Sequence, residues 1–295
     1  MLRKFCLLFL VILGGVGASN AQLIKEYRAP EKEGFDLVLF EFSSYKSSTH
    51  LKRVRISDPI AIHGHLEKAN ILPYFSHQVS DNILYSSLVH KNVESDNLGK
   101  SITSKIFSSG NDDFGHSWDI SLNSNFLYHL DFTLGVGKAE FDLAQLPISQ
   151  LKVKSASADV KIHYGNEDPN RVRMDTLLVT LNMGTVNVQS ANFTNAKKMI
   201  FEVNYGNLNL NFSDGMSSPS SVIAAVGAGT LKLKLPPENF PVRIKVRTTA
   251  MCRTSIPKYL RSLGDETYVS KGYDPDDPNL LELIVDVGVG SLTVE

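Results

Sequence analysis

The sequence predicts an all-β fold: a single-stranded β-solenoid, which is a β-helix-like stack of coils, with an N-terminal β cap region and one insertion near the C-terminus. Three observations predict it. A twelve-residue pattern occurs six times from Leu130 onward. Each copy consists of two runs in which apolar and polar residues alternate, as in half-buried strands. A small residue separates the runs, and in the first five copies it recurs every 21 to 26 residues, a spacing typical of solenoids.

The copies share the position of this small residue, which we call the hinge. They read LDFTLGVGKAEF from Leu130, LKVKSASADVKI from Leu151, LLVTLNMGTVNV from Leu177, MIFEVNYGNLNL from Met199, VIAAVGAGTLKL from Val222 and LIVDVGVGSLTV from Leu283. Their hinges are Gly137, Ala158, Gly184, Gly206, Gly229 and Gly290. If the chain folds back once in every coil, the bend favours glycine, which tolerates positive φ and close approach of another backbone.

Alternation assigns the two faces of each strand. Positions seven, five and three before the hinge and two and four after it point to one side, and nearly all of them are apolar. Val186, Leu208 and Leu231, each two residues after a hinge, should therefore be buried together. On the other side, Glu140 should lie beside Lys161 if the coils stack in register.

One outward column is not polar. Six residues before the hinge, the first two coils carry Asp131 and Lys152, but the four later coils carry aliphatic residues. These are Leu178, Ile200, Ile223 and Ile284, which we call the aliphatic stripe. Contiguous exposed apolar patches of roughly a few hundred Å² usually mark a contact site. The stripe is therefore either covered by the N-terminal strands or the insertion, or it is a surface that binds a partner.

The region before the repeats, residues 22–128, is expected to form a cap and flanking strands. Strand-like composition marks Gly34–Tyr45 and the stretches that begin at Leu51, Ile83 and Ser101. Trp118, Ile120 and Leu122 alternate with polar residues about one coil length before the first copy. They predict a degenerate opening coil, because terminal repeats of a solenoid must cap an open end.

The repeats themselves, residues 129–295, are interrupted between the fifth and sixth copies. Residues 251–279 contain three prolines and two glycines and predict an insertion on one edge of the solenoid, in which SIPKYLRSLGDE is the helix-like portion. Insertions of this kind are often where solenoids differ in function.

The first 21 residues have the features of a signal peptide. Arg3 and Lys4 precede an apolar run, and Ser19-Asn20-Ala21 provides the small residues that signal peptidase requires, so cleavage is expected before Gln22. The run is short for a bilayer span of about 20 residues, so the mature chain is expected to have no membrane span. An exported protein is expected, in the periplasm, associated with the outer membrane, or extracellular.

Charge and motifs exclude several classes of function. The net charge is −1, so no basic field favours nucleic acid. We expect no catalytic residues, no cofactor and no metal. Asp274 to Asn279 has several oxygen ligands but lacks an EF-hand pattern, and His63 with His65 has no third ligand at a recognisable spacing. Cys252, the one cysteine of the mature chain, has no local histidine context.

The repeats, the PVRIKV stretch at Pro241–Val246 and the closing LIVDVGVGSLTVE resemble the toastrack-type β-solenoid domains of bacterial cell-envelope proteins. That group includes adhesin-like proteins of unknown function and the C-terminal domain of LiaF-type cell-wall stress regulators. The resemblance implies a binding or scaffolding role without catalytic residues. LiaF-type proteins carry several membrane helices before this domain, and this sequence has none, so regulation of a kinase is not carried over.

The sequence leaves three classes of function open. The first is a non-enzymatic, exported cell-envelope protein, a scaffold or adhesin-like module that contacts an unknown protein or glycan of the envelope. The second is a carbohydrate-active enzyme on a solenoid scaffold, which would need a groove with two carboxylates roughly 5–10 Å apart. The third is a sensor of envelope stress, which depends on the family resemblance alone.

Overall fold

A computed structural model describes residues 23–29, 34–66, 73–89 and 116–295. The expected signal peptide and the strand expected from Ser101 lie outside these ranges. The described chain is built from strands that join into one sheet of sixteen strands, with two short 3-10 turns, η2 (Gly165–Glu167) and η3 (Ala191–Thr194). No helical segment within these ranges has the length and apolarity that crossing a bilayer requires.

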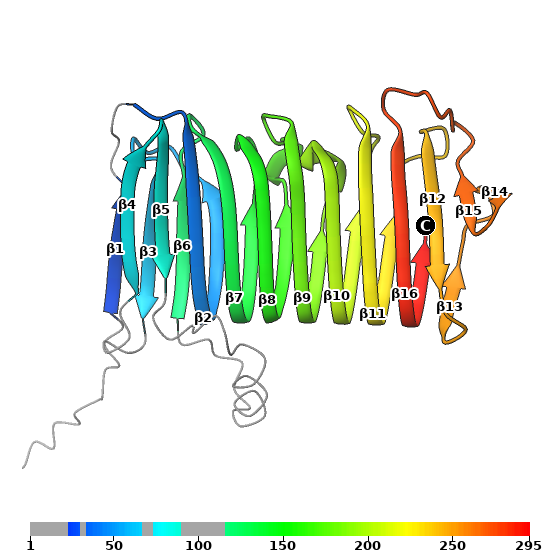
Figure 1. Cartoon of the computed structure of the whole chain (residues 1–295), viewed down its shortest axis with the longest axis horizontal. Helices are drawn as coiled ribbons and strands as arrows, with labels where there is room; N and C mark the ends of the chain where they lie inside the picture. Colours follow the sequence, from blue (N-terminus) through cyan, green and yellow to red (C-terminus); the bar gives the residue numbers. More distant parts are fainter. Residues whose placement is uncertain (1–22, 30–33, 67–72, 90–115) are drawn as a thin grey trace, which may run out of the picture.

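Six long strands correspond to the six copies of the repeat. They are β7 (Leu127–Asp142), β8 (Ile148–His163), β9 (Met174–Val188), β10 (Ala196–Asn211), β11 (Ser220–Lys234) and β16 (Leu281–Val294). Each runs down one layer of the molecule, bends at its hinge and returns in the other layer, so that the coils stand side by side (Figure 1). The predicted β-solenoid is therefore the observed fold.

The coils stack in parallel and in register. Leu208 pairs with Val186 on one side and with Leu231 on the other, and the hinges Gly184, Gly206 and Gly229 pair in the same way. All of Val186, Leu208 and Leu231 are fully buried. The hydrophobic columns expected from alternation therefore lie between the two layers, where each coil covers the apolar side chains of its neighbours.

The composition of the core changes along the stack. Near β7 it is aromatic: the ring of Phe132 lies 4.7 Å from that of Phe141 and 6.1 Å from that of Phe40, measured between centroids. Toward β11 and β16 the inward positions carry valine, leucine and alanine instead, all buried. This continuous apolar core holds the two layers together. The described residues contain no disulfide that would add a covalent link between them.

The bends explain why the hinges are glycine. In Gly206 φ is 141°, and a Cβ added there would lie 1.9 Å from the carbonyl oxygen of Gly184 in the neighbouring coil. The other four glycine hinges have the same two features. Ala158 is not among the described non-glycine residues with positive φ, so the one non-glycine hinge of the six copies bends with a different φ.

The stack begins one coil earlier than the sequence repeat. β2 (Leu37–Arg53) combines the two strands expected around Gly34–Tyr45 and from Leu51, and it pairs with β7 along both arms. Ser47 takes the hinge position, opposite Gly137. Buried Ser44, Ser47 and Thr49 occupy the bend and hydrogen-bond with one another. Because serine and threonine occupy the buried positions at this bend, alternation did not identify this coil.

Each layer continues past β2 at the N-terminal end. One layer adds β5 (Ile83–Val89) and then β4 (Tyr74–Ser80), which is antiparallel to β5. The other adds β6 (His116–Leu122), β3 (Ile60–Leu66) and β1 (Leu23–Ala29). The expected opening coil at Trp118 is thus a single strand, β6, that lies beyond the coil β2.

The insertion caps the other end of the stack. β12 (Val242–Thr248), which contains most of the PVRIKV stretch and precedes the insertion, and β13 (Cys252–Ser255), within the insertion, both pair with β16, so β16 lies between β11 and these two strands. The helix expected in SIPKYLRSLGDE is wrong. That segment forms β14 (Arg261–Gly264), which makes a hairpin with β15 (Thr267–Val269), because Asp265 and Glu266 take positive φ and turn the chain.

Candidate functional site

The aliphatic stripe lies on the outward face of the layer formed by the arms that precede the hinges. Ile200 pairs with Leu178 on one side and with Ile223 on the other, and Ile223 pairs with Ile284. The four side chains therefore form one row across β9, β10, β11 and β16. With strands about 4.8 Å apart, the row is roughly 14 Å long. All four side chains are half-buried, as expected for residues that touch one another but face away from the core.

The described strands of the N-terminal region and of the insertion do not lie over this row. In sheet order, β5 and β4 continue one end of the layer, and β12, β15 and β14 continue the other (Figure 1). The described strands therefore continue the layer at its two ends and leave the stripe uncovered.

Charged residues mark the ends and the margins of the stripe. Lys152 precedes Leu178 in the row, and Lys245 follows Ile284. Lys245 donates a hydrogen bond of 2.8 Å to Asp265, and this contact lowers the pKa of the Asp265 carboxyl. An apolar row with a charged rim has the general anatomy of a protein interface.

A shallow hollow of about 280 Å³ lies beside the stripe, nearer the bends. Its floor is formed by small residues, and Glu202 and Asp286 stand on either side of Ala225. Their Cα atoms are two strand steps apart, roughly 9.5 Å, so the two carboxylates are candidates for the pair that a glycosidase needs. Both carboxylates are exposed, however, whereas a general acid that works near neutral pH needs a carboxyl shielded from water. The hollow does not have the chemistry of a hydrolase site.

The polar pairs on the outward faces are structural. Lys161 donates a hydrogen bond of 2.7 Å to Glu140, as the register predicts. His163 lies 3.2 Å from the same carboxylate. The hydrogen bond from Lys161 is the largest cause of the lowered pKa of Glu140. These ion pairs link neighbouring coils, and because they are largely exposed each contributes at most about 1 kcal/mol.

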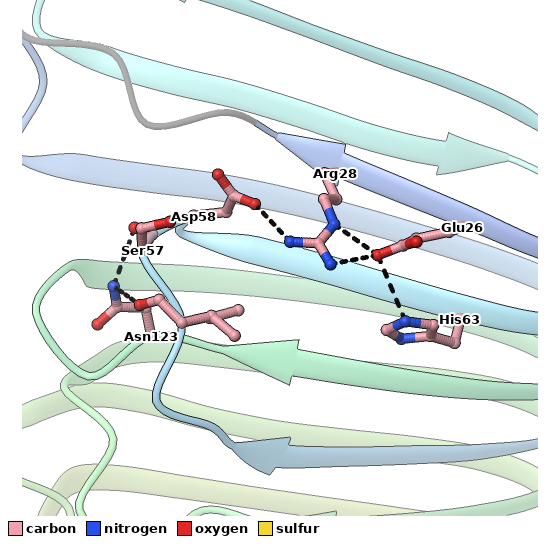
Figure 2. A network of polar contacts seen from close by, with 7 residues as sticks. Glu26, Arg28, Ser57, Asp58, His63 and Asn123 are labelled. Carbon is pink, nitrogen blue, oxygen red and sulfur yellow. Dashed lines mark hydrogen bonds and ion pairs between the residues drawn. The ribbon is translucent and has the colours of Figure 1, made fainter.

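Three of the residues that could have suggested a metal are engaged in other contacts. His63 lies 3.4 Å from Glu26, which also pairs with Arg28 (Figure 2). Asp274 and Asp277 each accept a hydrogen bond from the backbone two residues later, as in polar turns. In the part of the chain that the structure describes, no group of three or more His, Cys, Asp or Glu residues could hold a metal ion.

Part of the sequence matches a known protein family. Residues 63–178, from within β3 to within β9, match the family of the N-terminal domain of toast_rack. The chain contains a toast-rack-type domain. The match runs from the strands of the N-terminal end into the coils β7 and β8, which agrees with a sheet that is continuous across that boundary. The match ends near the start of β9 and therefore covers only the N-terminal part of the stack.

Two solved structures are similar to this chain over most of its length. One is a candidate cell adhesion protein from Clostridium sporogenes, with 13% sequence identity, a TM-score of 0.45 and coverage of 92% of this chain and 98% of that chain. The other is a candidate adhesin from Bacteroides fragilis, with 13% identity, a TM-score of 0.38 and coverage of 94% of this chain and 98% of that chain. No curated protein matches the sequence.

Proposed function

We propose that this protein is a non-enzymatic, exported module of the cell envelope, whose rigid toast-rack stack presents a surface for contact with a protein or glycan. The observation that carries the proposal is the aliphatic stripe. It is a straight row of four apolar side chains in register on the outward face of a sheet, without a described strand over it.

The chemistry of the stripe favours a protein partner over a glycan. Leu178, Ile200, Ile223 and Ile284 offer neither hydrogen bonds nor a flat ring. Apolar side chains on a partner protein would replace water over the row, which is favourable by about 25 cal/mol for each Å² of apolar surface buried. The row is small compared with a stable interface, which buries roughly 800 Å² on each partner. It would therefore form the apolar centre of a larger contact, with the neighbouring lysines in its rim.

The exported location is supported by the N-terminal pattern of Arg3, Lys4, the apolar run and Ser19-Asn20-Ala21. Processing is directly measurable. Mass spectrometry of the protein recovered from its host should give an N-terminus at Gln22. A chain that keeps Met1 to Ala21 and stays in the cytoplasm would contradict this part of the proposal.

A single substitution tests the contact surface. Ile223→Asp places a carboxylate in the centre of the stripe, and Thr230→Asp is the matched control, because it adds the same charge to the same strand on the opposite outward face. We expect purified wild type and Thr230→Asp to bind isolated envelope fractions equally. Ile223→Asp should bind at least about 10-fold more weakly, as expected for loss of a central apolar contact. Its thermal unfolding should stay close to that of the control.

Two results would contradict the proposal. One is unchanged envelope binding by a folded Ile223→Asp variant. The other is turnover of polysaccharide or ester substrates by the purified wild-type protein, which would favour the carbohydrate-active enzyme instead.

A further inference from the structure

A second surface feature lies on the same layer, at its N-terminal end. A groove of about 410 Å³ is formed on the outward face of β2, β5 and β4. Two rows of paired residues form its floor: Leu39, Tyr85 and Gln78 in one, and Glu41, Ser87 and Ser76 in the other. Its volume falls within the range of ligand pockets, roughly 300–1,000 Å³.

Two exposed tyrosines line the groove. Tyr74 lines it from β4 and is 59% exposed, and Tyr85 lines it from β5 and is 38% exposed. A tyrosine offers both a flat apolar ring and a hydroxyl that donates or accepts a hydrogen bond. Around them, Ser76, Ser87 and Gln78 add short polar groups that can both donate and accept hydrogen bonds.

We propose that this groove binds a neutral carbohydrate. A sugar ring has a flat face of C–H groups and a rim of hydroxyls, so it needs an aromatic surface together with mixed donors and acceptors at close range. The groove provides both, whereas the aliphatic stripe provides neither. The proposal rests on the contact role proposed above, but it assigns the glycan to a different site from the protein.

Charge decides which carbohydrates fit. The carboxylate of Glu41 lines the groove, and Asp131 pairs with Glu41 on the next strand, β7. The described residues that line the groove include no lysine or arginine, and His77 is the one basic side chain among them. Glu41 can accept hydrogen bonds from sugar hydroxyls, and charge-assisted bonds of this kind are the stronger ones. A carboxylated or phosphorylated sugar would instead meet like charge, so a neutral saccharide is the favoured ligand.

The proposal is tested by titration calorimetry, which measures the binding of defined oligosaccharides to the purified full chain. The probes are cellotetraose, chitotetraose and mannotetraose as neutral tetrasaccharides, and tetragalacturonate as an acidic one. We expect at least one neutral probe to bind and tetragalacturonate to bind at least about 10-fold more weakly. Glu41→Gln should reduce the difference in affinity between the neutral probe and tetragalacturonate, because it removes the negative charge and keeps the size of the side chain.

The tyrosines provide the site-specific controls. Tyr74→Ala and Tyr85→Ala should each weaken binding of the neutral probe by about 10-fold, the scale of one lost aromatic contact. Tyr85→Phe, which keeps the ring, should change it by no more than about 3-fold. Tyr205→Ala, at an equally exposed tyrosine (62%) beside the bend of β10, should leave it unchanged.

Three results would overturn the proposal: no binding of any neutral probe, binding that survives both Tyr74→Ala and Tyr85→Ala, or equal binding of tetragalacturonate. The two sites can fail separately. Ile223→Asp should leave saccharide binding intact, and Tyr74→Ala should leave thermal unfolding and stripe-dependent envelope binding intact. Failure of the groove is thereby distinguished from failure of the contact role.

Discussion

Replacing Gly206 with alanine adds one methyl group at the point where two coils touch. Its Cβ would lie 1.9 Å from the carbonyl oxygen of Gly184, and that oxygen belongs to backbone that cannot rotate away. In addition, φ of 141° is a conformation that side chains rarely adopt, which costs roughly 1–3 kcal/mol. Separating the coils would weaken at least one inter-coil hydrogen bond, a further cost of about 1 kcal/mol.

The expected loss of unfolding free energy for Gly206→Ala is therefore about 3 kcal/mol, a large share of the roughly 5–15 kcal/mol that stabilises a typical domain. Urea unfolding followed by circular dichroism measures it directly, and thermal unfolding should show a decrease in Tm of roughly 6–12 °C. Asn207→Ala is the control, because Asn207 is the exposed neighbour in the same coil. It should change stability by less than about 0.5 kcal/mol.

A Gly206→Ala protein as stable as Asn207→Ala would refute the reasoning, because it would mean that the bend has room for a side chain. The comparison with Ala158 makes the point specific. The loss is expected only at a glycine that has positive φ and lies against the backbone of another coil, and Ala158 is not such a residue.

Two further predictions follow from the core and from pH. Leu208→Ala, in a fully buried column, should lower the free energy of unfolding by about 2–4 kcal/mol, whereas Asn209→Ala on the outward side should have little effect; equal effects would mean that the column is not inward. Desolvation lowers the pKa of His129 in the folded protein below its usual 6.5, so the unfolded chain binds the proton more tightly. Stability should fall as the pH decreases from above 6.5 through the folded pKa, and His129→Gln should reduce this loss. A pH dependence identical to wild type would contradict the assignment.

Much of the stack could be predicted from the sequence because burial imposes a period of two on each arm and the bend imposes a small residue. Val186, Leu208 and Leu231 are where alternation placed them, and the sixth copy stacks on the fifth although 61 residues separate Gly229 from Gly290. The ion pair between Lys161 and Glu140 could be predicted because the aligned hinges gave the register of the two coils.

The coil β2 and the strands of the insertion could not be predicted, because no local sequence pattern indicates them. The coil β2 bends at Ser47 and buries Ser44 and Thr49, so its inward positions next to the bend read as polar, although those farther along its arms are apolar. The insertion has a helix-like distribution of residues, but pairing with β12 makes strands there, since a hydrogen-bonding edge outweighs weak helix propensity.

The candidate site was found only in part. The aliphatic stripe could be located because six aligned hinges define a column. The groove could not, since Tyr74 and Tyr85 are on an antiparallel pair, β4 and β5, outside the repeat, and their juxtaposition with Glu41 depends on a pairing of β5 with β2 that the sequence does not encode locally.

The in-register stack is tested most directly by distances between spin labels along one outward column. Lys138, Asn207, Thr230 and Ser291 lie in this column on β7, β10, β11 and β16. With Cys252 replaced by serine, label pairs from position 138 to positions 207, 230 and 291 should give mean distances near 14, 19 and 24 Å, which increase by about 4.8 Å for each coil. Distances that do not increase in this order, above all a label at 291 nearer to 138 than the label at 230, would contradict the stack.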